Sequence, residues 1–247
     1  MINKAGREIP EEILKATGKK PFEGAYAYDN YEYKKAAPTV RALSDPKRSK
    51  MVDSIREALE KCGLRDNMTL SFHHHFREGD YVLNMVLDEI AKMGIKNLTV
   101  NASSIFDVHE PIIGHIKNGV VTGIECNYMG AKVGKAISEG IMDKPVVFRS
   151  HGGRASDMEK GTSVIDVAFI AAPTADDMGN CTGKIGPSAC GSIGYAFADA
   201  MNAKKVVVVT DNLVAYPLVG FSIPEVYVDY VVKVDQIGNP AGIVSGT

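Results

Sequence analysis

The chain has 247 residues, of which 45% are hydrophobic and 23% are charged, and its formal net charge is −2. This is the composition of an ordinary globular protein, long enough for one large domain or two small ones. The lack of a basic excess argues against a nucleic-acid-binding protein. The N-terminus lacks the apolar core of a signal peptide, and no run approaches the roughly 20 apolar residues of a membrane helix. We therefore expect a cytoplasmic protein that binds neither nucleic acid nor membrane.

The chain divides into an arm and a body. Residues 1–40 contain Pro10, Pro21 and Pro38 and are expected to form an extended arm with one short helix at residues 10–17. Residues 41–247 follow a regular pattern and are expected to form one α/β domain. Its expected helices lie at residues 46–62, 79–94, 111–119, 129–140 and 191–203. Its expected strands lie at residues 68–72, 97–103, 120–126, 145–150, 164–172, 204–212 and 227–235.

Strands that alternate with helices and read as continuous apolar runs are typical of a buried parallel sheet. The sequence therefore predicts an α/β fold with a parallel or mostly parallel sheet flanked by helices. In such a sheet, ligands bind where the strands end. The loops that follow the strands are residues 73–80, 104–111, 151–157, 173–191 and 213–217.

Three histidines, His73, His74 and His75, directly follow the first strand of the body. His73 and His75 can share a face, since side chains alternate along a strand. No third ligand at a suitable spacing is evident nearby, so we expect no metal site. The histidines could instead bond an anionic substrate or a thioester oxygen. The structural alternative, that they are satisfied core groups and one is solvated, stays open.

The run FRSHGGRASD, residues 148–157, ends a strand with two arginines around paired glycines. Arg149 and Arg154 could each grip a carboxylate in a bidentate way. Paired glycines let a backbone approach a ligand closely and present N–H groups to an oxyanion. The alternative is a tight turn with solvated arginines.

The loop at residues 173–191 is long and rich in small residues, and Ser188 to Gly191 leads into a helix N-terminus. Such termini attract anions, and long loops in compact domains are often functional. We favour a binding loop over a disordered surface loop, because disorder is expected to carry more charge. Neither the Walker A motif nor the Rossmann fingerprint is present.

None of the four cysteines forms a CxxC pair. Cys181 and Cys190 have no histidine in their own loop that could act as a base. Cysteine is also among the residue types most often buried. We therefore expect no catalytic cysteine.

Several long runs resemble the family of citrate lyase alpha subunits, over essentially the full chain. These runs are DNMTLSFHHHFREGDYVLNMVLDEIAKMG, NASSIFDVHEPI, VFRSHGGRASD, AAPTADDMGNCTGKIGPSACGSIGYAFADA and VVTDNLVAYP. The resemblance implies a fold like that of coenzyme A transferases, related to the sheets of glucosamine-phosphate deaminase and ribose-phosphate isomerase. It also implies that this chain is the first of two similar halves with the active site between them. The second half is absent, so we expect the chain alone to be catalytically incomplete.

The reaction that the resemblance implies converts an acetyl-carrier and citrate into a citryl-carrier and acetate. The carrier is the phosphopantetheine-type arm of a small acyl-carrier gamma subunit, and coenzyme A thioesters can replace it. A separate beta subunit then cleaves the citryl thioester. The resemblance therefore implies an oligomeric complex with no cofactor tightly bound in this subunit. The citrate lyase type is understood to use a mixed anhydride, whereas other coenzyme A transferases carry the thioester on a glutamate.

Residue roles follow from the same resemblance. His73, His74, His75 and Phe76 stand where the broader superfamily has a GGFG loop, and the three histidines are the expected catalytic residues. The expected substrate-binding residues are Arg77, Arg149, His151, Gly152, Gly153 and Arg154. The expected carrier-binding residues are Gly179, Asn180, Thr182, Gly183, Ser188 and Gly191.

Three alternatives stay open. A citramalate lyase alpha subunit resembles this family and acts on a similar acid. A sugar-phosphate isomerase on a related sheet would show no dependence on a thioester. A noncatalytic scaffold would keep its binding to the carrier after the loop arginines and histidines were removed.

Overall fold

An eight-stranded parallel sheet forms the centre of the molecule. The computed structural model describes residues 1–24, 27, 40–41, 48–73 and 75–243, so His74 lies outside the described residues. The strands lie in the order β1-β11-β9-β6-β2-β3-β4-β5, and every neighbouring pair runs parallel. Their bounds are β1 Met51–Val52, β2 Thr69–Phe72, β3 Leu98–Ala102, β4 Val121–Cys126, β5 Val147–Phe148, β6 Val167–Ala171, β9 Lys205–Thr210 and β11 Tyr230–Lys233. The fold class predicted from the sequence is confirmed.

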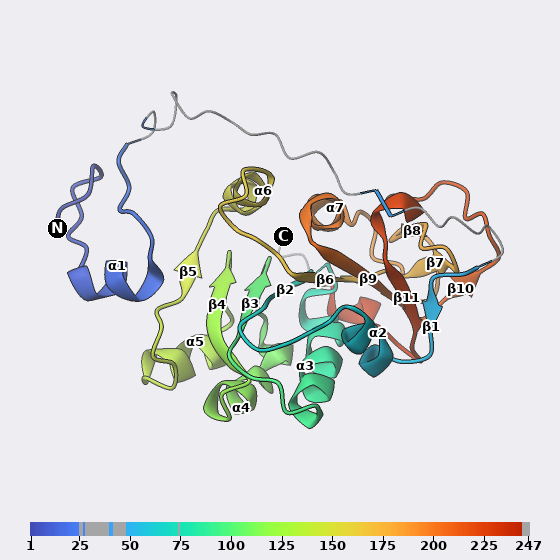
Figure 1. The fold of residues 1–247 in the computed structure, drawn as a ribbon, viewed down its shortest axis with the longest axis horizontal. Coiled ribbons are helices and arrows are strands. Elements are labelled where there is room, and N and C mark those ends of the chain that lie inside the picture. Colours follow the sequence, from blue (N-terminus) through green and yellow to red (C-terminus); the bar gives the residue numbers. More distant parts are fainter. Residues whose placement is uncertain (25–26, 28–39, 42–47, 74, 244–247) are drawn as a thin grey trace.

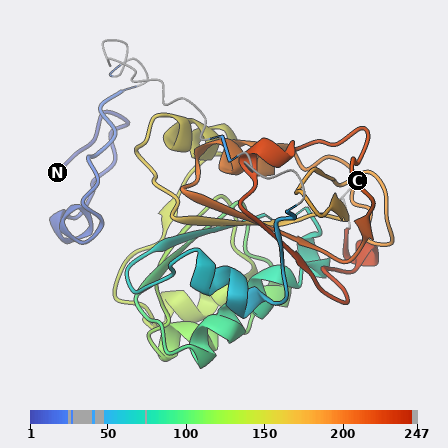
Figure 2. The same cartoon turned by 45° about the vertical axis from the view of Figure 1, so that its right-hand side comes forward.

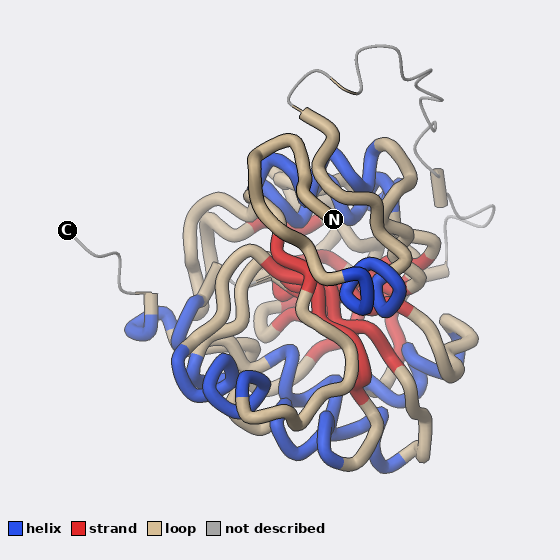
Figure 3. Tube along the Cα trace, turned by 90° about the vertical axis from the view of Figure 1, so that its left-hand side faces the viewer, coloured by secondary structure: helices blue, strands red, loops and turns tan. Residues whose placement is uncertain are grey.

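Helices cover both faces of this sheet, and Figure 3 shows the strands as a layer between them. On one face lie α2 Ile55–Lys61, α3 Val82–Lys92, α4 Ile112–Lys117 and α5 Ala131–Ser138, which share one core cluster with the sheet. On the other face lie α6 His151–Glu159 and α7 Gly194–Asn202, which pack side by side and share a second cluster. Figure 1 shows the two groups of helices apart. The apolar runs of β6 and β9 are buried because both faces of the sheet are covered.

The strand order reverses next to β2. From β2 the chain adds β3, β4 and β5 on one side, and it later adds β6, β9 and β11 on the other. In open parallel sheets the crevice at such a switch point is the usual ligand site, at the carboxyl ends of the strands. The loop that carries His73 and His75 leaves β2 at this point. The topology therefore places the histidine run where a ligand site is expected.

Several expected segments differ from the structure. Within the segment expected to be a helix at 46–62, Met51 and Val52 form the edge strand β1. α2 begins only at Ile55, because Ser54 caps it by accepting a hydrogen bond from the Glu57 N–H at 3.1 Å. The segment 151–157, expected to be a loop, is the first part of α6. The other expected strands and helices are present with shorter bounds.

The loop expected at 173–191 contributes two of the three strands of a small second sheet. Its strands are β7 Thr174–Asp176, β8 Cys181–Thr182 and β10 Leu213–Val214, in the order β10-β7-β8. The N-terminal segment contains α1 Glu11–Thr17, which confirms the short helix expected there. No residue of α1 is buried, and Figure 2 shows this helix beside the body. No helix within the described ranges has the length and apolar character needed to cross a membrane.

Two short 3-10 helices, Arg77–Gly79 and Pro240–Gly242, pack tightly through glycine backbone. A Cβ at Gly79 would lie 2.0 Å from the Asn239 carbonyl oxygen.

We expect Gly79→Ala to destabilise the fold by about 1–3 kcal/mol, because one of the two backbones must move. The matched control is Gly114→Ala in α4, where a Cβ meets open space. That change is expected to stabilise by up to about 1 kcal/mol. Denaturant unfolding measures both, and equal midpoints for the two variants would contradict the close packing.

Candidate active site

A cleft of about 520 Å³ lies at the carboxyl ends of the strands. Its lining comes from the loop after β2, the segments after β3 and β4, the start of α6, the residues around the start of α7, and Ile243. The side chains that line the cleft include those of His73, His75, Arg77, Ser103, Ser104, Tyr128, His151, Cys190 and Tyr195. The cleft therefore brings together four of the residues that the sequence nominated, which are His73, His75, Arg77 and His151.

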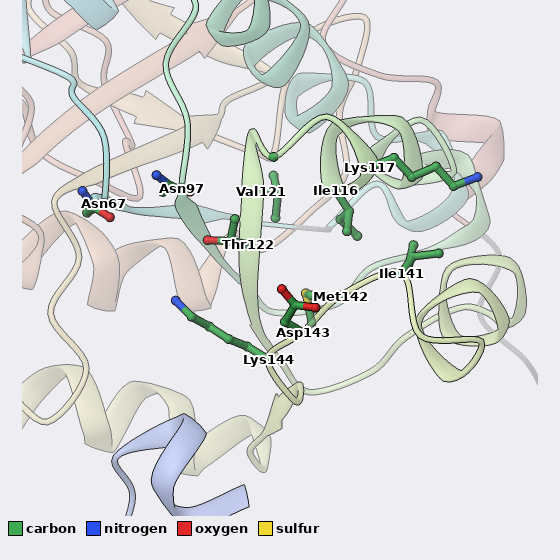
Figure 4. Close-up of a pocket in the computed structure, with 11 residues that line it drawn as sticks. Asn67, Asn97, Ile116, Lys117, Val121, Thr122, Ile141, Met142, Asp143 and Lys144 are labelled. Atoms are coloured by element: carbon green, nitrogen blue, oxygen red, sulfur yellow. The ribbon is translucent and has the colours of Figure 1, made fainter. Parts of the chain in front are cut away.

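A second hollow lies at the opposite edge of the sheet and is about 470 Å³ in volume. Figure 4 shows its lining residues, which include Asn67, Asn97, Thr122 and Lys144. These residues stand at or just before the starts of β2, β3, β4 and β5. The amino ends of parallel strands are not where such sheets bind their ligands. We therefore place the functional site in the cleft at the carboxyl ends.

The two described histidines of the run are neutral and lie parallel. Their ring centroids are 6.1 Å apart with an interplanar angle of 10°. Burial, opposed by Asp199 and assisted by the nearby Arg154 and His75, lowers the pKa of His73 from 6.5 to about 3. Burial also lowers the pKa of His75, whose Nε2 lies 2.7 Å from the Ala171 carbonyl oxygen. Each neutral ring has one N–H donor and one acceptor nitrogen.

Arg154 does not line the cleft. Its side chain is 2% exposed and forms an ion pair with Asp199, with Nη1 2.9 Å from Oδ2 and Nη2 3.0 Å from Oδ1. Its Nε donates to the Asn101 Oδ1 at 2.7 Å, and Nη2 also donates to the Ser71 Oγ at 2.7 Å. This placement differs from the expected carboxylate grip, because the guanidinium is already bonded inside the protein.

Arg149 is also paired within the chain. Its Nη1 lies 2.6 Å from a Glu125 carboxylate oxygen, and its Nε lies 2.6 Å from an Asp157 oxygen. The side chain is 9% exposed and does not line the cleft. A ligand carboxylate would have to displace one of these partners. The expectation that Arg149 grips a substrate is therefore not supported by its position.

The paired glycines belong to the first turn of α6. Ser150 caps this helix, and its Oγ accepts a hydrogen bond from the Gly153 N–H at 3.0 Å. A Cβ at Gly153 would lie 2.9 Å from that oxygen, so the cap favours glycine there. The Gly153 N–H is thus used by the cap, whereas His151 lines the cleft beside Tyr195, with ring centroids 5.4 Å apart. Gly152 meets open space.

Most of the residues expected to bind the carrier support the small sheet instead. The Asn180 side chain bonds the carboxylates of Asp176 and Glu225. The Ser188 hydroxyl donates to the Asp211 carboxylate, and the Thr182 hydroxyl bonds that of Ser222. Close packing restricts two glycines, since a Cβ would lie 2.7 Å from Val228 at Gly179 and 2.4 Å from the Gly191 carbonyl at Gly183. Gly191 is exposed and directly follows Cys190 at the edge of the cleft.

Two helix N-termini meet at the cleft. The first residue of α6, His151, and the first residue of α7, Gly194, both line it. Each helix has nine residues, and no side-chain cap covers the start of α7. The unpaired N–H groups and the helix dipoles give this end of the cleft a partial positive charge. With Arg77 at the same cleft, the arrangement suits an anionic ligand.

Sequence reasoning missed several lining residues. Ser103 and Ser104 follow β3, and their place after a strand could have drawn attention to them. Tyr128 follows β4 in the same way, whereas Tyr195, within α7, carries no such signal. Asp199, within α7, is completely buried and 3.3 Å from His73, and only the tertiary structure reveals that contact. Within the described part of the chain, no group of three or more metal-ligating side chains is placed to hold an ion.

Comparisons with known proteins identify the family of the chain. The family model for citrate lyase, alpha subunit (CitF), matches residues 48–247. The chain belongs to the citrate lyase alpha subunit family. The citrate lyase alpha chain of Klebsiella pneumoniae is 41% identical over 238 residues, which cover 96% of this chain and 45% of that protein. This member of the citrate lyase alpha family thus spans about half the length of the curated relatives it matches.

Solved structures extend the comparison. A candidate citrate lyase alpha subunit from Streptococcus mutans, solved in complex with citrate, matches with a TM-score of 0.89 and 53% identity. The match covers 97% of this chain and 46% of that chain. Glutaconate coenzyme A-transferase from Acidaminococcus fermentans matches with a TM-score of 0.55 at 15% identity, over 79% of this chain and 77% of that one. The second likeness shows that the fold is that of coenzyme A transferases.

Acidification is expected to destabilise the protein through His73. The pKa of the His73 ring is about 3 in the folded protein. At pH values between about 3 and 6.5, the ring is therefore protonated in the unfolded chain and neutral in the folded one. The contribution to stability is complete above pH ~6.5 and is lost as the pH falls toward ~3. We expect His73→Gln to flatten the fall in unfolding free energy between neutral pH and pH ~4.5, measured with denaturant. His115→Gln, in α4 outside the cleft, is the control. An unchanged pH dependence in His73→Gln would contradict the prediction.

The cysteines are expected to be unreactive. Burial raises the pKa of the Cys190 thiol to about 11 and raises that of Cys181 further. Both are therefore protonated at neutral pH, and the thiolate is the nucleophile. We expect slow alkylation by iodoacetamide, and we expect Cys181→Ser and Cys190→Ser to keep the activity of the parent protein. Alkylation of Cys190 faster than that of free cysteine at the same pH would overturn this expectation.

Proposed function

We propose that this protein transfers an acyl carrier between carboxylic acids, as the alpha subunit of citrate lyase. The reaction converts an acetyl thioester and citrate into a citryl thioester and acetate. The observation that carries the proposal is the anion-suited cleft, where His73, His75 and Arg77 face two helix N-termini. The 53% identical Streptococcus mutans relative was solved with citrate, which supports a tricarboxylate as the acceptor acid.

The proposed route passes through a mixed anhydride. A citrate carboxylate attacks the acetyl carbonyl, and the carrier leaves as its thiolate. The thiolate then attacks the citryl carbonyl of the anhydride, and acetate leaves. Among the described residues that line the cleft there is no aspartate or glutamate, and the proposed second half would complete the lining. N–H groups at the two helix starts would stabilise the oxyanion that forms in each step.

The carrier substrate is proposed to be a phosphopantetheine-type thioester, with coenzyme A as a substitute. The proposed partners are the beta subunit that cleaves the citryl thioester and the acyl-carrier gamma subunit, in an oligomeric complex. Membership of the citrate lyase alpha family supports this assembly. We also propose a cytoplasmic location. The chain is proposed to divide into an arm, residues 1–40, and a body, residues 41–247. The body is proposed to be the first of two similar halves.

The roles of individual residues are revised by the geometry. We propose that His73, His75, Arg77 and His151 act on the ligand, since all four line the cleft. Arg149, Arg154 and Gly153 are proposed to shape the site from behind it, because their donors bond within the chain. Of the six residues expected to bind the carrier, we keep only the exposed Gly191 in that role. We propose that the carrier contacts Gly191 and the start of α7 beside it.

An assay of acetyl thioester plus citrate, with the second half supplied in trans, tests this function. We expect His73→Ala or His75→Ala to lower kcat/KM by about 10²-fold, because each change removes a ring that positions the ligand in the cleft. His115→Gln is the matched control and is expected to stay within about twofold, because it touches no part of the cleft. Near-normal rates in both cleft variants would favour the packing role of these histidines.

The same assay separates the alternatives. Preference for citramalate over citrate would make the protein a citramalate lyase alpha subunit. Turnover of a sugar phosphate without any thioester would indicate an isomerase. Carrier binding that survives the loss of His73, His75 and Arg77, together with no transfer, would indicate a docking scaffold.

A further inference from the structure

A fully buried carboxylate stands directly behind His73. Asp199, on α7, is 0% exposed, and its Oδ2 lies 3.3 Å from the Nε2 of His73. His73 is itself 3% exposed. Neither of its ring nitrogens has a hydrogen-bond partner of good geometry among the described residues. Contacts of this kind are often long before a ligand binds and shorten in the complex.

The chain holds the Asp199 carboxylate in place and ionised. Arg154 reaches both of its oxygens, and the Ser71 hydroxyl donates to Oδ1. Burial opposes the negative charge, but the charge and hydrogen bonds of Arg154 and the hydrogen bond from Ser71 favour it, and the pKa of Asp199 lies below its usual value. An ionised carboxylate can only accept hydrogen bonds. The group that faces it must therefore offer a proton.

His73 meets this condition in one of its two neutral forms. The charged groups that face its ring are Asp199 and Arg154, and the ring of His75 stacks on it. With the proton on Nε2, the ring donates to Asp199; with the proton on Nδ1, two acceptors would face each other inside the protein. The buried Nδ1 has no partner among the described residues in either form, but only the first form gives Nε2 a partner. The first form is therefore favoured.

We propose that Asp199 is a positioning residue that holds the His73 proton on Nε2 and so leaves Nδ1 as an acceptor nitrogen for the ligand in the cleft. The ligand's identity rests on the function proposed above, whereas the tautomer does not. The carboxylate fixes the ring as second partners of functional histidines generally do, through orientation and tautomer rather than through contact with substrate. The two-point ion pair with Arg154 keeps the carboxylate from turning away.

A second reading is that Asp199 serves only as the counter-charge of Arg154. In that case its contact with His73 would be incidental. The two readings differ in what they predict for the proton on the ring. A structural counter-charge stabilises the fold without setting the tautomer, whereas a positioning carboxylate sets it.

Long-range nitrogen–proton NMR of the ligand-free protein, with ¹⁵N-labelled histidine, reads the tautomer directly. The chain has six histidines, so His73→Gln identifies the signal. We expect His73 to show the Nε2–H form across neutral pH. In Asp199→Asn the donors of Arg154 take the amide oxygen, and the amide NH₂ then faces His73 as a donor. The ring is expected to move its proton to Nδ1, and transfer to citrate is expected to fall by about tenfold or more.

Matched variants keep the test decisive. Ser71→Ala removes a bond to the same carboxylate without touching the His73 contact, so the Nε2–H form is expected to persist. Asp199→Asn leaves Arg154 without its counter-charge, and the variant can fail to fold. The double variant Asp199→Asn with Arg154→Gln keeps the pair neutral, and in it the Nε2–H form is expected to lose its dominance.

An Nδ1–H form of His73 in the parent protein would overturn the proposal. So would an unchanged Nε2–H form in both Asp199→Asn and the double variant. The NMR result needs no substrate. If His73 has the expected tautomer but the protein does not transfer acyl groups to citrate even with the second half supplied in trans, the proposed function is wrong and the role of Asp199 stands.

Discussion

A guanidinium and a carboxylate can be buried together only if each satisfies the other and every remaining polar atom is bonded. The pair Arg154 and Asp199 meets this requirement between the sheet and the helices that cover it. Arg154 comes from α6 and Asp199 from α7, and the pair also bonds Ser71 of β2 and Asn101 of β3. Ser71 and Asn101 are direct neighbours in the sheet register, so the strands present a polar row to the pair. Four elements distant in the sequence are thereby fixed relative to one another.

The geometry of the cleft follows from that constraint. Because α6 and α7 are tied to the same ion pair, their first residues are brought to one place, at the end of β2. Asp199 also meets His73, two residues beyond Ser71 and on the same face of the extended chain. The buried network therefore supports the fold and positions the site through the same atoms. Losing one partner would leave an uncompensated charge and would disturb both.

The lining of the cleft suits the stabilisation of charge, which the proposed acyl transfer requires. Its lining offers neutral imidazoles, N–H groups at two helix starts and one protonated thiol, Cys190, all of which favour charge stabilisation over covalent attack. Likeness in fold to glutaconate coenzyme A-transferase does not extend to the lining, since folds host different chemistries. The small sheet of β7, β8 and β10 holds Asn180 and Thr182 in internal bonds and so braces the segment that leads into α7.

The sequence alone determined the parallel α/β sheet, because apolar runs such as Val206–Val209 alternate with helical patterns, and it determined the family through long matching runs. It also placed His73 and His75 directly after a strand. In the structure that strand is β2, next to which the strand order reverses. It could not decide which charged residues face a ligand. The sequence around Arg154 predicts a loop residue at the surface. Arg154 is buried instead, because Asp199, 45 residues later, lies beside it and pairs with it. Only the packing of α6 against α7 brings these two charges together, and local periodicity carries no information about a partner that distant.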